Sequence, residues 1–177
     1  IQTDQGDFDC DNAVVTSGIW SKPLMKRLGL SVPLEAERGY HVVYKNASIL
    51  PKNPMLAAGK FGITPMGNNL RCAGTVELGG IEYGPSRRPV RLIKSFVQDA
   101  FPKLEYDGIE EWMGFRPTTT DSLPLIGQIA QSGIYTAFGH QHIGLTSGPK
   151  SGRIVANMID GKVSNNDLSA FDPARFM

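Results

Sequence analysis

Residues 139–161 read GHQHIGLTSGPKSGRIVANMIDG, and this stretch indicates how the chain is organised. Its first ten residues include three glycines and two histidines, which favours a tight loop with exposed backbone amides. From about Thr146 the pattern predicts a helix, because four apolar residues fall on one face: Ile154, Val155, Met158 and Ile159.

The two ends of this helix carry matching signals. Pro149 suits the first turn, where its missing N–H costs nothing, and Gly161 suits the stop. A helix N-terminus after a glycine loop offers free N–H groups and partial positive charge, so it can hold an anionic or electron-rich group. An ordinary strand-to-helix turn without a ligand has the same pattern, and both interpretations stay open from this segment alone.

The composition is that of a globular protein without a strongly charged surface. The 177 residues are 41% hydrophobic, and 18 basic and 17 acidic residues give a net charge of +1. This balance gives no reason to expect a nucleic-acid partner. The two cysteines, Cys10 and Cys72, have no metal or redox spacing, so we expect buried thiols.

No apolar run approaches the length of a membrane helix, and nothing at the start resembles a signal peptide. We therefore expect a cytoplasmic protein, with peripheral attachment to the inner face of a membrane as an alternative. The chain begins at Ile1 without an initiator methionine, which suggests a piece of a longer protein.

The remaining patterns predict α/β structure at both ends and an antiparallel sheet between them. Near the start, a buried strand at 13–15 and a helix at 19–28 that ends at Gly29 form one strand–helix unit. In the central part of the chain the residue pattern predicts strands at 38–44, 55–58, 61–65 and 69–76 and a helix at 87–101. It also predicts a strand or extended segment at 104–114. We predict domain segments at 1–34, 35–104 and 105–177, the first and last belonging together.

Three ordered phrases resemble one family. GFRPTTTDSLPLIG at 114–127 is similar to a signature of flavin-dependent D-amino-acid dehydrogenases and glycine oxidases. YTAFGHQHIGL at 135–145 resembles that family's strand and loop against the flavin, and AVVTSGIWSKPL at 13–24 resembles its loop near the dinucleotide. The resemblance covers nearly the whole chain.

The resemblance implies FAD as cofactor and a partial Rossmann-like FAD-binding domain with an inserted antiparallel-sheet substrate domain. The family opens with a G-x-G-x-x-G turn and an acidic residue that hold the ADP half of FAD, and neither occurs here. The chain therefore resembles the C-terminal part of such an enzyme, and most pyrophosphate contacts would come from an N-terminal segment.

Arg116 is the first candidate for substrate binding. A guanidinium matches a carboxylate with two parallel hydrogen bonds, which lysine cannot copy. The resemblance implies that Arg116 holds the α-carboxylate of the substrate; a surface or interdomain ion pair is the alternative. His142 lies where some relatives place a second polar group over the substrate, and a loop histidine bonded to backbone is the alternative.

Other residues are assigned by the same resemblance. Tyr40 lines the substrate side, although strand aromatics are more often core. The cofactor would be held by two groups of residues: Ser17, Gly18 and Trp20 near the dinucleotide, and Gly139, His140, Ile143, Gly144, Leu145 and Thr146 against the flavin. The three histidines, His41, His140 and His142, lack a fourth ligand and metal-site spacing, so we predict no metal.

The implied reaction is hydride transfer from the α-carbon of a D-amino acid or related amine to flavin, after which the imine hydrolyses to a keto acid and ammonia. The electron acceptor, a quinone or oxygen, is not determined by these motifs, and oligomerisation is left open. The alternatives are an oxygen-using amine or amino-acid oxidase and a non-catalytic folded fragment or subunit that lacks the dinucleotide motif.

Overall fold

The computed structural model describes residues 1–162 and 164–176. It divides into two compact units, which we call unit 1 (residues 1–35 and 116–177) and unit 2 (residues 36–115). Unit 2 is thus inserted into unit 1 in the sequence. The assignment of these units to FAD and substrate binding stays a prediction.

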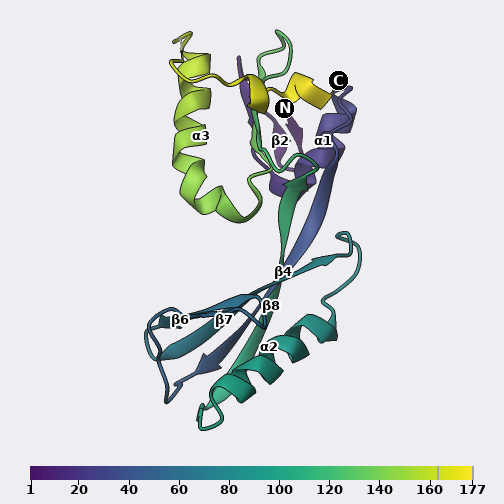
Figure 1. Cartoon of the computed structure of the whole chain (residues 1–177). Helices are drawn as coiled ribbons and strands as arrows, with labels where there is room; N and C mark the ends of the chain where they lie inside the picture. Colours follow the sequence, from purple (N-terminus) through teal and green to yellow (C-terminus); the bar gives the residue numbers. More distant parts are fainter. Residues whose placement is uncertain (163, 177) are drawn as a thin grey trace. The chain divides into compact units, whose positions relative to one another are not determined.

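Unit 1 is built on a three-stranded sheet in the order β3 (Ala13–Val15), β10 (Ile134–Phe138), β9 (Leu125–Gln128). β10 pairs with β3 in parallel and with β9 in antiparallel fashion. The 3₁₀ turn η1 (Gly18–Trp20) and helix α1 (Ser21–Arg27) follow β3, and η2 (Gln141–Ile143) and α3 (Gly144–Ile159) follow β10. Val155 of α3 packs on Ile126 and Tyr135, which fixes α3 against the sheet (Figure 1).

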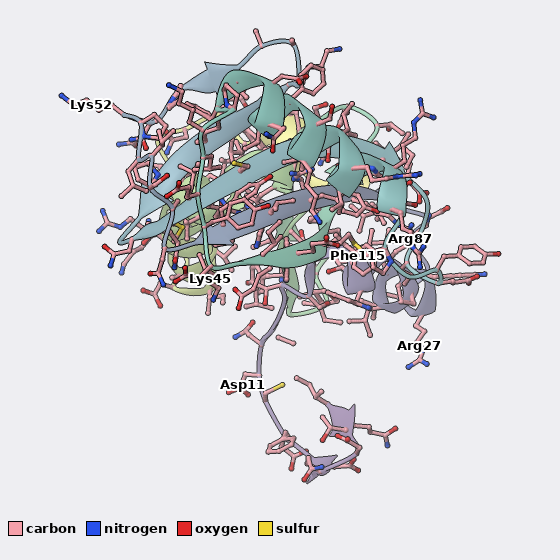
Figure 2. The ribbon with its side chains drawn as sticks, turned by 90° about the horizontal axis from the view of Figure 1, so that it is seen from below. Asp11, Arg27, Lys45, Lys52, Arg87 and Phe115 are labelled. Carbon is pink, nitrogen blue, oxygen red and sulfur yellow. The ribbon has the colours of Figure 1, made fainter. Side chains whose placement is uncertain are left out.

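The N-terminal hairpin of unit 1 is exposed, whereas its C-terminal turn is bonded to the rest of the unit. The hairpin β1 (Gln2–Thr3) and β2 (Gly6–Asp7) is fully exposed, and the segment that contains Asp11 joins it to β3 (Figure 2). The turns η3 (Ser169–Phe171) and η4 (Pro173–Phe176) end the chain. Arg175 of η4 forms two hydrogen bonds with the Asp121 carboxylate, at 2.7 and 3.3 Å, which ties the C-terminal turn to the turn after β8.

Unit 2 is an antiparallel sheet with one helix on one face (Figure 1). The strand order is β5 (Met55–Leu56), β6 (Phe61–Met66), β7 (Asn69–Leu78), β4 (Leu34–Lys45), β8 (Gly108–Thr119), and the helix is α2 (Arg87–Ala100). Val90, Ile93 and Val97 of α2 are buried against inward-facing side chains of the strands, which include Val42, Ile63 and Leu70. The predicted meander and the predicted helix at 87–101 are confirmed.

Some local predictions were wrong. Helix α3 begins at Gly144, not near Thr146, and Pro149 lies inside it. Pro149 removes only the hydrogen bond to the Leu145 carbonyl, and Leu145 is 97% exposed, so water can take that place.

Burial was also overestimated near the N-terminus. Val14 of β3 is 42% exposed because β3 is an edge strand of the sheet. In the predicted helix at 19–28, Met25 is buried, but Trp20, Leu24 and Leu28 are exposed. Cys72 is buried as expected, but Cys10 is exposed because it lies on the segment that follows the projecting hairpin.

Within the described part of the chain, every helix is too short or too polar to cross a membrane.

Candidate functional site

Two loops of unit 1 leave the same edge of its sheet. β3 and β10 run in parallel with Val14 beside Tyr135 and Val15 beside Thr136, so their carboxyl ends coincide. The loop after β3 carries Ser17, Gly18 and Trp20, and the loop after β10 runs from Gly139 to α3. The fold thus brings the predicted cofactor residues of both loops to one edge, the place where open α/β sheets bind ligands.

The loop after β3 is short and internally bonded. Ser17 Oγ lies 3.1 Å from Oγ of the fully buried Ser21, and the Trp20 amide donates to the Ser17 carbonyl at 3.1 Å. Gly18 has φ 58°. Trp20 is 55% exposed, so its indole is accessible at this edge.

The loop after β10 begins with a close approach at Gly139. Its φ of 85° is strained for any residue with a Cβ, and a Cβ there would lie 3.2 Å from Cγ2 of Thr119. Thr119 is the last residue of β8. The absence of a side chain at Gly139 therefore lets the loop after β10 pass close to the end of β8.

His140 connects this loop to α3. Its Nε2 lies 2.8 Å from Ser151 Oγ, and Ser151 in turn donates to the Ser147 carbonyl at 3.2 Å. Burial lowers the pKa of His140, so the ring is neutral near pH 7, with Nε2–H as the donor to Ser151. This geometry gives His140 a role in anchoring the loop.

The N-terminus of α3 presents backbone donors. The Ile143 amide is not free, because it donates to the His140 carbonyl at 3.1 Å. The first helical residues, Gly144, Leu145 and Thr146, carry N–H groups that have no intrahelical acceptor. Leu145 is 97% exposed and Ile143 is 59% exposed, so this helix end is open.

Gln141 is a residue that sequence reasoning did not single out. It has φ 50°, and its Nε2 is buried without a hydrogen-bond partner among the described residues. A buried amide left unpaired costs free energy unless a bound group accepts its hydrogen bond. Its only signal in the sequence was its position between two histidines in a glycine loop.

These donors suit the electron-rich edge of a flavin. The free amides of α3 and the Gln141 side-chain amide are donors, and a flavin ring edge offers carbonyl and ring-nitrogen acceptors. The helix end also contributes partial positive charge. The residues present at this edge therefore fit the cofactor that the sequence predicted.

The predicted substrate residues lie on separate elements. Arg116 is half-buried in β8, at the start of the second segment of unit 1, and His142 is exposed in η2. Tyr40 belongs to unit 2 and is 2% exposed. Its hydroxyl donates to the Glu77 carboxylate and accepts a 3.1 Å hydrogen bond from the Ser86 amide.

Tyr40 nevertheless borders a cavity of about 260 Å³ in unit 2, together with Ser86, Arg87 and Glu111 among others. A second cavity of about 530 Å³ lies in unit 1 between β9, β10 and the end of α3. None of the predicted site residues lines this second cavity. The substrate roles of Arg116, His142 and Tyr40 stay predictions.

The family described as FAD dependent oxidoreductase matches residues 1–158 of the chain. The chain belongs to this family. The resemblance seen in the three sequence phrases and the prediction of FAD as the cofactor are both confirmed by this match.

Two curated relatives are named as enzymes of D-amino acids. The chain is 38% identical to a D-amino-acid oxidase of Bradyrhizobium diazoefficiens over 100% of its own length and 44% of the relative. It is 33% identical to a D-amino acid dehydrogenase of Vibrio atlanticus over 96% of its length and 42% of the relative. The chain thus spans less than half the length of these curated relatives.

The fold agrees with this. The glycine oxidase of Geobacillus kaustophilus matches with a TM-score of 0.83 at 26% identity, over 99% of this chain and 48% of the oxidase. The predicted class, α/β with an antiparallel insertion, is confirmed by this likeness.

Proposed function

We propose that the protein containing this chain oxidises D-amino acids or related small amines with FAD. The observation that carries the proposal is the donor edge of unit 1, where the loops after β3 and β10 leave the same edge of the sheet and the second loop leads into the open N-terminus of α3. The names of the relatives, D-amino-acid oxidase and D-amino acid dehydrogenase, support the substrate class.

Bound FAD would supply the hydride acceptor for the substrate α-carbon. The chain's own groups would hold and polarise the reactants. The amides of Gly144, Leu145 and Thr146 would donate to the flavin edge, where negative charge develops during reduction, and the partial positive charge of the α3 N-terminus would favour that charge.

Arg116 would bind the substrate α-carboxylate with two parallel hydrogen bonds. Its place in the GFRP phrase of β8 supports this role. Pro117 follows it and keeps the chain extended behind the guanidinium. His142, exposed in η2, would offer a second polar group to the substrate, and Tyr40 would line the substrate side.

Arg116→Lys in the complete protein tests this role. We expect a strong rise in KM for D-alanine with unchanged FAD content, and a loss of about 2–5 kcal/mol in transition-state binding, because lysine cannot form the paired hydrogen bonds. Steady-state kinetics and the flavin absorbance of the purified variant provide the measurement. An unchanged KM would contradict the carboxylate role.

Flavin binding and catalysis are tested separately. The chain is mixed with FAD and followed by flavin fluorescence, and D-amino acid is then added under anaerobic conditions. Binding followed by bleaching supports the oxidoreductase. Binding without bleaching places the missing function in the rest of the protein, and a complete protein without bound flavin would contradict the proposal.

The electron acceptor separates a dehydrogenase from an oxidase. The two relatives carry these two different names, so the complete protein should be assayed both for hydrogen peroxide release and for reduction of a quinone analogue. Peroxide release at the rate of substrate loss would identify an oxidase.

A further inference from the structure

The face of the unit 2 sheet opposite α2 carries a cluster that the proposed function does not use. Side chains alternate along a strand, so the neighbours of the buried Val42 and Cys72 project away from the helix. On that face lie Arg71 of β7, His41 of β4 and Trp112 of β8, on three neighbouring strands. We call these three residues the open-face cluster.

Trp112 is held flat on the sheet. Its ring stacks on His41 with centroids 4.9 Å apart and planes inclined by 15°. A Cβ at Gly114 would lie 2.0 Å from the Trp112 ring, so a larger residue there would displace the indole from its place over the strand. Trp112 is still 55% exposed, which leaves much of a fixed aromatic surface accessible.

His41 is held in one hydrogen-bonding state. Its Nδ1 lies 3.2 Å from a terminal nitrogen of Arg71, and arginine has donors only, so Nδ1 is the acceptor. In the neutral ring the proton therefore lies on Nε2, which makes Nε2–H a further donor. Burial and the Arg71 charge lower the pKa of His41, while Glu110 opposes them.

The cluster lacks a counter-anion. Among the residues that the structure describes, Arg71 has no salt bridge, although it is half-buried. Glu110 is the acidic group that faces His41 from β8, and it is paired with Lys45 at 2.7 Å. The cluster thus combines an unneutralised guanidinium, a histidine N–H donor and an exposed aromatic ring.

We propose that Arg71, His41 and Trp112 form a binding site for an organic carboxylate. The planar guanidinium matches the two oxygens of a carboxylate, His41 adds a donor, and Trp112 covers an apolar or flat part of the ligand. The site consists of unit 2 residues only, so it goes beyond the proposed function and does not depend on flavin binding.

The indole of Trp112 gives a direct readout. In the full chain with Trp20→Phe, Trp112 is the remaining tryptophan, and its fluorescence is followed during titration with 3-phenylpropionate. The neutral amide of the same acid is the matched ligand control. We expect a saturable change with the acid and a much weaker one with the amide.

Variants distinguish the site from general charge attraction. Arg71→Gln should weaken 3-phenylpropionate binding about tenfold or more, because a charge-assisted pair is lost. Lys52→Gln removes the same charge from a loop of unit 2 and should leave the affinity within about twofold. Circular dichroism verifies that each variant is folded. If Arg71→Gln does not fold, Arg71→Lys replaces it, because lysine keeps the positive charge but lacks the paired donors of the guanidinium.

The pH dependence gives an independent measurement. A carboxylate beside His41 stabilises its protonated form, so binding should raise the His41 pKa, as followed by NMR of the ring, and affinity should increase as pH falls through that pKa. Arg71, Glu110 and its partner Lys45 are the charged groups around this ring. Equal binding of acid and amide, equal affinity for inorganic phosphate, or unchanged affinity in the Arg71 variants would overturn the proposal.

Discussion

Two arginines of the unit 2 sheet, Arg38 and Arg71, differ in burial and in how many of their donors are used inside the protein. Arg38 of β4 is 3% exposed, and its guanidinium donates to the carbonyls of Gly79, Gly80, Tyr83 and Gly84 at 2.7–3.3 Å and to Glu77 at 3.4 Å. Arg71 is half-buried, and within residues 1–162 and 164–176 its one hydrogen bond is to His41. Every nitrogen of Arg38 is used inside the protein, whereas Arg71 keeps donors for another molecule.

The difference shows how to separate a structural cation from a binding one. Arg38, Glu77 and Tyr40 form a closed network that holds the 79–86 segment and the start of α2 on the sheet. Each polar group in that network has a partner, as buried polar groups require. The open-face cluster is instead rich in donors and poor in acceptors, which is the pattern of a site for an acceptor ligand.

Removing Arg38 should give the largest effect. Arg38→Met leaves the Glu77 carboxylate and four carbonyls without their donor, and we expect unit 2 to lose about 3–5 kcal/mol of unfolding free energy. Urea denaturation followed by Trp112 fluorescence measures it. Arg71→Met is the matched control and should cost less than about 1 kcal/mol; equal losses would remove the distinction between the two arginines.

Tyr40→Phe should have an intermediate effect. The ring stays in the core, but the Glu77 carboxylate loses a donor and the Ser86 amide loses its acceptor. We expect a loss of about 1–3 kcal/mol in the same denaturation experiment. Tyr44→Phe removes a hydroxyl from another buried tyrosine of β4 and is the comparison. A stable Tyr40→Phe protein with a raised substrate KM would instead favour the predicted substrate role of Tyr40.

Acid should weaken the closed network. Hydrogen bonds from Ser86 and Tyr40, with a smaller contribution from Arg38, lower the pKa of Glu77 in the folded state. A depressed carboxyl pKa stabilises the fold above the unfolded pKa, and that contribution is lost as pH falls from about 4.5 through the folded pKa. Glu77→Gln should remove this part of the acid dependence of unfolding; an unchanged pH profile would show that Glu77 is not the titrating group.

The smallest predicted effect concerns His41. Arg71 is one of the two causes that lower its pKa, so Arg71→Gln should raise the His41 pKa towards its ordinary value, although burial still opposes protonation. NMR titration of the ring measures the shift. Protonated imidazole against the indole should also quench Trp112, so the quenching midpoint should move upward in the variant. An unmoved midpoint would mean that the Arg71 charge does not act on His41.

The periodic elements could be predicted because their signals are local. Helix α2, the strands of the meander and the end of α1 before Gly29 depend on spacing within a few residues. The start of α3 could not, because Gly144 and Gly148 are weak helix residues and Pro149 imitates a first-turn signal. The exposure of Val14 depended on its strand being at an edge, which no local pattern records.

By itself, the sequence determined the family, through three short phrases, and the residue types for FAD and carboxylate chemistry. Only the tertiary structure decided which of these residues lie close to one another. Val15 lies beside Thr136, which places the two loops predicted to bind the cofactor at one edge, and Arg71 reaches His41 across the β7–β4 register. The physical reason is that strand pairing joins residues that are distant in the chain, and their register is set by cooperative burial of the core, which no single motif encodes.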